Sequence, residues 1–315
     1  MKRFAFRLAV ALSTLALGLT ITGVVGHRQQ TAPESPASPL TTAPEAVKEQ
    51  LPRVTEPQEN NIDFEAGYVG GDKLMYGDYE VERTVDREEE ISTATIKRNG
   101  HLVATFSNGR LGKEATAFGV FPLLGQETNQ LVIKQYTGGA HCCWIYKVYD
   151  SHPKLHLIFD DEYAGTNDLG YELHAEDIDG DGRYELIRSV MTFEYFFRIY
   201  SSSVWPTAVL SYDDKSRAYV PANPKFSRYL LRELHDNLKE LDSAKANVDP
   251  ENLGTNDGYR SAVLQVLLDY LYAGERENGW KFFNHEYRLS NKDKLRNDIE
   301  QALRSDPIYK SIYRY

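Results

Sequence analysis

An acidic loop carries the residues best suited to chemistry in this chain of 315 residues. Three Asp residues stand at alternate positions, and the glycine after the last of them permits a sharp turn. If the loop coils tightly, oxygen atoms of these side chains, of one carbonyl and of a nearby Glu converge on one point. Proteins hold calcium in such an oxygen cage, because calcium is a hard cation that takes about six to eight oxygen ligands. The candidate calcium ligands are Asp177, Asp179, Asp181, the carbonyl of Arg183, and Glu185.

Other interpretations of this loop are weaker. A helix-flanked EF-hand needs a Glu at the twelfth loop position, where this sequence has Arg188 between strand-like flanks, so that form is excluded. A magnesium site for phosphoryl transfer also uses paired Asp residues, but it needs an α/β surround that the neighbouring sequence does not predict. The remaining alternative is a solvated acidic turn without a metal. Calcium is favoured over these, and calcium held in this way is most often structural.

The loop resembles the calcium loops of integrin-type FG-GAP repeats, which are also described as VCBS-like. Their motif is a strand-flanked Asp-x-Asp-x-Asp-Gly loop with an acidic residue two positions after the backbone ligand, and here Glu185 replaces the more usual Asp. The resemblance implies a loop that braces the strands of propeller blades, in a protein that binds proteins or sugars more often than it catalyses. It covers this loop and a degenerate copy at Gly125–Leu131, so a full array of blades is not implied.

The two cysteines of the chain, Cys142 and Cys143, are adjacent. The stretch Gly-Gly-Ala-His-Cys-Cys is similar to segments of uncharacterised exported bacterial proteins, which implies a lineage and no activity. Neighbouring Cα atoms lie about 3.8 Å apart, whereas a disulfide prefers about 4.4–6.8 Å. A vicinal disulfide would therefore be a strained and easily reduced ring. The hypotheses are this vicinal disulfide, two buried thiols, or a redox or soft-metal site that includes His141.

An aromatic segment follows the acidic loop. Phe193, Tyr195 and Phe197 alternate with other residues and would share one face of a strand. Core packing beneath the loop is the expected role of such rings. A ligand platform for a sugar or a peptide is the functional alternative, because Tyr combines apolar area with a polar tip.

The elements that would position these groups begin with a β-rich domain over 62–221. Asn99-Gly100 predicts one tight hairpin, because both residues tolerate positive φ. Further hairpins are expected around 150–154 and around Pro206. The aromatic residues that close the hairpins stand at equal intervals, and a repeat of about 50 residues is typical of propeller blades. Three units are too few for an ordinary closed propeller, and an unrelated β-sandwich is the alternative.

A helical domain is predicted over 224–315, which makes the fold class α+β. Apolar residues recur at helical spacing over 226–241 and 263–271, and again over 295–303. Asp306-Pro307 is expected to end the last helix. The tyrosines beyond it are expected to dock the tail onto the β part or onto a partner. They are Tyr309, Tyr313 and Tyr315.

The N-terminus sets the expected compartment. Three basic residues precede the apolar run 8–25, which is typical of a signal peptide over 1–26 or of an uncleaved signal anchor. A Pro-rich disordered linker is expected over 27–61. The protein would then be periplasmic or extracellular, and attached to a membrane only if the signal is uncleaved. The net charge of −10 argues against a nucleic-acid partner and suits a divalent cation.

These features predict three functions. The first is an exported, calcium-stabilised binding or scaffold module for a protein or an envelope polysaccharide. The second is an exported hydrolase with acidic catalytic residues near the calcium loop, although no Ser-His-Asp motif, phosphate loop or zinc helix supports it. The third is a redox or soft-metal role of the His-Cys-Cys segment.

Overall fold

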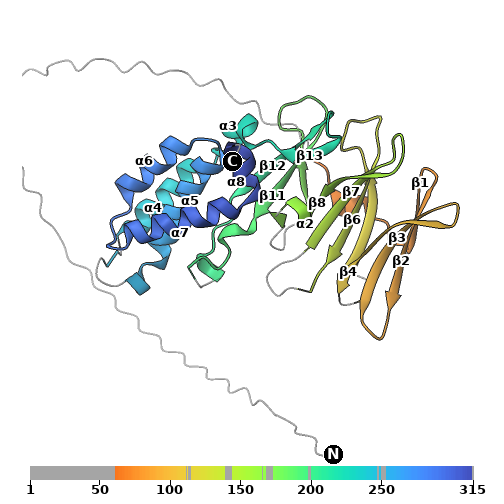
Figure 1. Cartoon of the computed structure of the whole chain (residues 1–315), viewed down its shortest axis with the longest axis horizontal. Helices are drawn as coiled ribbons and strands as arrows, with labels where there is room; N and C mark the ends of the chain where they lie inside the picture. Colours follow the sequence, from red (N-terminus) through yellow and green to blue (C-terminus); the bar gives the residue numbers. More distant parts are fainter. Residues whose placement is uncertain are drawn as a thin grey trace, which may run out of the picture. The chain divides into compact units, whose positions relative to one another are not determined.

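The structure is a computed structural model, and within the residues that it describes the chain is an α+β fold. Antiparallel strands come first and helices last (Figure 1). The described residues are 61–110, 112, 115–138, 144–164, 166–167, 173–197, 200–246, 248–249 and 253–313.

The described strands form three small antiparallel sheets that follow one another along the chain. Sheet one has the order β1-β2-β3-β4 and sheet two the order β5-β6-β7-β8. Sheet three has the order β10-β11-β12-β13, with β9 also paired to β11. The strands are β1 Lys73–Tyr76, β2 Tyr79–Asp86, β3 Ile91–Arg98, β4 His101–Arg110, β5 Thr116–Phe121, β6 Gln130–Tyr136, β7 Trp144–Asp150, β8 His156–Asp160, β9 Thr166–Asn167, β10 His174–Glu176, β11 Glu185–Val190, β12 Thr207–Asp213 and β13 Ala218–Pro221.

Two of the three predicted hairpins are confirmed, and the third is wrong. β3 and β4 turn at Asn99 (φ 51°) and Gly100 (φ 79°), as the Asn-Gly pair predicts. β7 and β8 form the second hairpin. No strand precedes Pro206 in the described part of this segment. Instead β12 pairs with β11 on one side and with β13 on the other, so the real hairpin turns after Asp213.

Sheet two is a layer whose two faces enter different hydrophobic clusters. Leu131 and Ile133 of β6 pack in one cluster with Ile96 of sheet one. Val132, between them, and Tyr146 of β7 belong to a second cluster that includes sheet three and the helices. β6 is buried at six successive positions, and its central Leu131–Ile133 run is the apolar pattern of a strand that is covered on both faces.

The helical part matches the predicted periodicity except at its end. Asp306 does end α7, but its Oδ1 accepts a hydrogen bond from Tyr309 N (2.7 Å), and Pro307 begins another helix, α8. The prediction that this pair closes the helix lined by Leu295, Ile299 and Leu303 is therefore confirmed, and α8 is a further helix that the sequence did not predict. Asp before Pro also starts helices, because Asp caps the free N–H groups and Pro is preorganised for the first turn. The helices are α1 Phe64–Gly67, α2 Asp161–Ala164, α3 Ser227–Leu230, α4 Leu234–Lys245, α5 Asp257–Tyr272, α6 Arg276–Glu286, α7 Lys292–Ser305 and α8 Pro307–Tyr313.

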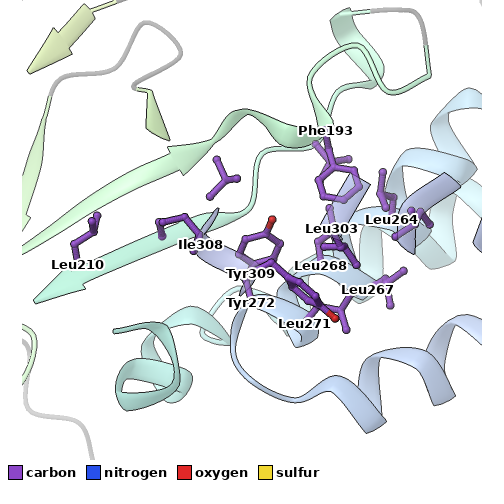
Figure 2. Packing of buried hydrophobic residues seen from close by; sticks show 14 of the residues in the cluster. Phe193, Leu210, Leu264, Leu267, Leu268, Leu271, Tyr272, Leu303, Ile308 and Tyr309 are labelled. Carbon is purple, nitrogen blue, oxygen red and sulfur yellow. The ribbon is translucent and has the colours of Figure 1, made fainter. Parts of the chain in front are cut away.

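The larger hydrophobic cluster joins sheet three to the helices. Figure 2 shows Leu210 of β12, Leu267 of α5 and Ile308 of α8 within it. Tyr309 is also buried in this cluster, where its ring lies against Tyr272 of α5, and Tyr315 lies outside the described residues. The division into a β domain over 62–221 and a helical domain over 224–315 stays a prediction.

Candidate metal centre

The acidic loop lies between β10 and β11, and their pairing holds its ends together. Glu176 of β10 is paired with Glu185 of β11, so the chain must reverse within 177–184. Gly180 (φ 74°) and Gly182 (φ 87°) adopt the left-handed conformation that this reversal requires. Asp177 Oδ2 accepts a hydrogen bond from Gly182 N (3.0 Å), which closes the turn across the loop.

Three carboxylates of this loop converge, as the spacing predicts. Oxygen atoms of Asp177, Asp179 and Glu185 all lie within 4.8 Å of one another. Glu185 is 2% exposed, and its Oε2 accepts a hydrogen bond from Ile178 N (3.1 Å). Asp177 Oδ1 is buried and has no hydrogen-bond partner among the described residues. This cluster could hold a metal ion.

Burial of the third carboxylate is costly without a cation. The pKa of Glu185 is raised to about 7, chiefly by desolvation and also by the charges of Asp179 and Asp181, while the hydrogen bond from Ile178 N lowers it. Lys225 lowers it. A group in this position favours either a proton or a positive ion, since both cancel the buried charge.

The Asp181 side chain is not among the three carboxylates that converge, and the calcium-ligand role of the Arg183 carbonyl stays a prediction. Asp181 Oδ1 accepts a hydrogen bond from Arg183 N (2.8 Å), which holds that side chain along the loop. The guanidinium of Arg183 donates to Asp214 Oδ2 (2.9 Å) on the far side of the loop. Of the side chains expected to bind calcium, the structure therefore brings together Asp177, Asp179 and Glu185.

Lys225 is the residue of this site that sequence reasoning missed. Its Nζ lies 2.5 Å from Asp179 Oδ2, and it is supplied by a 3₁₀ turn at Asn223–Phe226, between sheet three and the helices. The hydrogen bond to Asp179 raises the pKa of Lys225, so the ammonium stays charged. Nothing in its local sequence indicates this contact, because only the fold brings the turn to the loop.

The predicted aromatic strand is wrong. Met191–Phe193 is a 3₁₀ helix, and Tyr195 has a φ of 53°, which a strand residue does not adopt. Phe193 (0% exposed) and Phe197 (6%) pack in the core, and only Tyr195 (46%) presents its ring to solvent. The rings do not share one face, because apolar burial overrides the alternation of the sequence. A platform built from all three rings is not formed.

Two other predictions fall on residues that the structure does not describe. Cys142 and Cys143 lie outside the described residues, so the vicinal disulfide and the redox or soft-metal site stay predictions. The apolar run 8–25 also lies outside them. Among the described residues, no helix is both long and apolar enough to cross a membrane.

Comparison with known proteins finds distant relatives. The uncharacterized protein y4bJ of Sinorhizobium fredii is 26% identical over 238 residues, which cover 71% of this chain and 35% of that protein. The probable thylakoid lumen protein sll0997 of Synechocystis is 24% identical over 222 residues, which cover 69% of this chain and 62% of that protein. The chain thus spans about a third of the first relative and less than two thirds of the second. No protein family and no solved structure matches it significantly.

Proposed function

We propose that this protein is an exported binding module whose acidic loop holds a calcium ion that stabilises the folded chain. Its partner in this proposal is a protein or an envelope polysaccharide. The observation that carries the calcium site is the convergence of Asp177, Asp179 and Glu185 around a buried oxygen without a partner. Export is supported by the signal-like N-terminus and by the name of the lumenal relative.

A hard cation such as calcium suits the donor set better than a soft metal. Every side-chain ligand is a carboxylate oxygen, which favours a hard cation, and no described thiol or imidazole belongs to the cluster. The three carboxylates supply fewer oxygens than calcium takes. In this proposal the carbonyl of Arg183, the side chain of Asp181 and water complete the shell. The ammonium of Lys225 leaves Asp179 when the ion binds.

Calcium is expected to raise the melting temperature of the purified protein by about 5–10 °C at 100 times its dissociation constant. An ion that binds only the folded state stabilises it by RT ln(1 + [L]/Kd), about 2.7 kcal/mol at that concentration. For a chain of this size, about 1 kcal/mol corresponds to roughly 2–4 °C. Melting followed by circular dichroism with calcium, with magnesium and with chelator measures the shift.

Matched Asp→Asn variants show which carboxylates hold the ion. Asp179→Asn is expected to abolish the calcium shift, and Asp242→Asn, on the exposed face of α4, should retain it. Asp181→Asn should reduce the shift only in part, because Asp181 lies outside the cluster. A wild-type protein that melts at the same temperature with calcium and with chelator would show that the calcium site is wrong.

Replacing Lys225 with Met is expected to tighten calcium binding about two- to fivefold. The ammonium competes with the ion for Asp179, and an exposed ion pair is worth only about 0.2–1 kcal/mol, which sets the size of the gain. The gain should shrink as salt is added, since the Lys225 side chain is 53% exposed. Calorimetric titration measures the affinity, with Lys239→Met, on the exposed face of α4, as the control. A weaker affinity in Lys225→Met would mean that the lysine supports the site rather than competes with the ion.

A further inference from the structure

A polar cavity of about 260 Å³ lies between sheet three and the helices α3, α4 and α5. One wall comes from β11, β12 and the connection that joins them, and the opposite wall comes from the helices. At about 30 Å³ for each water molecule, the cavity has room for roughly eight waters or for one sugar-sized ring. Polar side chains dominate its lining, so a purely apolar ligand would leave hydrogen-bonding groups unpaired.

The helical wall holds a carboxylate fixed by two amides. Asp269 Oδ2 accepts a hydrogen bond from Asn237 Nδ2 (2.8 Å), and Asp269 Oδ1 accepts one from Gln265 Nε2 (2.8 Å). No basic side chain among the described residues forms an ion pair with Asp269, and desolvation raises its pKa to about 6. Each amide donates one N–H to the carboxylate, and its carbonyl oxygen stays available to accept a hydrogen bond from a ligand. This wall therefore offers fixed acceptors to a ligand that donates hydrogen bonds.

The lining also offers donors and flat surfaces, from Tyr229 of α3 and Arg232 just after it and from Trp205 on the connection between β11 and β12. The guanidinium of Arg232 stacks on the Tyr229 ring at 3.9 Å, and the Tyr229 hydroxyl donates to Glu176 Oε2 (2.7 Å), which fixes the ring. The ring of Trp205 also lines the cavity. Its Nε1 is closed off from solvent and has no acceptor in the described chain, so the indole carries a buried donor that is not yet paired there.

We propose that this cavity binds one neutral saccharide unit. Hydroxyl groups both donate and accept, so they match a lining that has both acceptors and donors. The C–H face of a sugar ring suits the indole of Trp205. An ammonium ligand could use Asp269 but would leave the donors unpaired, and Glu233, the second carboxylate of the lining, is already paired with Arg232 (3.5 Å). The inference rests on the proposed role in binding a polysaccharide, and it needs no calcium.

Titration of the full-length protein with sugars tests this inference. The probes are glucose, galactose, mannose and N-acetylglucosamine, with putrescine as the cationic alternative, followed by tryptophan fluorescence and by saturation-transfer NMR. At least one sugar is expected to bind saturably. Asp269→Asn should weaken that binding about tenfold or more, because a hydrogen bond to a charged acceptor is lost. Asp242→Asn on α4 should bind as the wild type does.

Several outcomes would overturn the saccharide site. They are the absence of binding by every sugar, unchanged binding by Asp269→Asn, or binding of putrescine alone. If Asp269→Asn does not fold, Trp205→Phe decides by NMR, because it keeps a ring but removes the N–H, and unchanged binding would contradict the site. Calcium-dependent melting of the same samples separates the two proposals. A calcium shift without sugar binding removes only the saccharide site, and sugar binding without a calcium shift removes only the ion.

Discussion

Replacing Arg188 with Met is expected to lower the free energy of unfolding by about 3–5 kcal/mol. Arg188 of β11 and Asp161 at the start of α2 form a two-bond ion pair, with distances of 3.0 Å and 2.7 Å between nitrogen and oxygen. Their side chains are 1% and 0% exposed. The variant would remove both charge-assisted bonds from the buried carboxylate of Asp161, which also accepts a hydrogen bond from Tyr146 N (3.0 Å), and the cost of burying this charge without its positive partner dominates the loss.

Because this ion pair lies between two sheets, its removal is expected to destabilise both of them. Asp161 follows the last strand of sheet two, and Arg188 lies in the second strand of sheet three, so the pair joins the two sheets. The guanidinium also lies over the Tyr146 ring of β7, at 4.9 Å from its centre. Because both side chains are buried between the sheets, removing either partner weakens the junction.

Denaturant unfolding with three matched variants measures the effect. Arg98→Met removes a similar pair, with Asp78, whose side chains are 49% and 73% exposed, and it should cost at most about 1 kcal/mol. The double variant Arg188→Met with Asp161→Leu should recover part of the loss, because it leaves no unpaired charge. Equal losses in Arg188→Met and Arg98→Met would contradict the argument, since burial would then make no difference.

Local sequence signals predicted the parts of the fold that depend on neighbouring residues. The Asn99-Gly100 turn is decided by the φ values that its two residues tolerate, and α5 by apolar residues at helical spacing. The segment around Tyr195 was mistaken for a strand because alternating aromatics have the period of a strand. There, burying Phe193 and Phe197 in a shared core decides the backbone, and that core is assembled from distant residues.

The residues of the candidate site were likewise predictable from the sequence only where the signal is local. The alternate spacing of Asp177 and Asp179, with Glu185 after the turn, indicated a cation cage, and the structure brings these side chains together. Lys225 and Asp269 could not be assigned from the sequence. Each is one charged residue in an ordinary polar context, and its partners come from other elements. Contacts between distant elements depend on how the sheets and helices pack, which local patterns do not report.

Replacing Leu267 with Ala is expected to lower the stability of sheet three as much as that of the helices, by about 2–5 kcal/mol. Leu267 of α5 is 0% exposed and lies in the cluster that also contains Leu210 of β12 and Val132 of β6. Asn223 adds a polar connection, since its Nδ2 donates both to Thr207 O (2.9 Å) in β12 and to Tyr272 O (3.0 Å) in α5. A cavity in this cluster removes contacts from both parts at once.

Native-state hydrogen exchange followed by mass spectrometry resolves the two parts in one sample. If they unfold as one unit, Leu267→Ala reduces the protection of peptides from β12 and from α5 by the same free energy. Ile133→Ala, in the cluster between sheets one and two, tests the coupling in the opposite direction, from the sheets to the helices. It should reduce the protection of α5. Two independent domains would behave differently, because Leu267→Ala would then leave the protection of β6 and β12 unchanged. The shared cluster argues against that independence, since neither part buries its apolar face without the other.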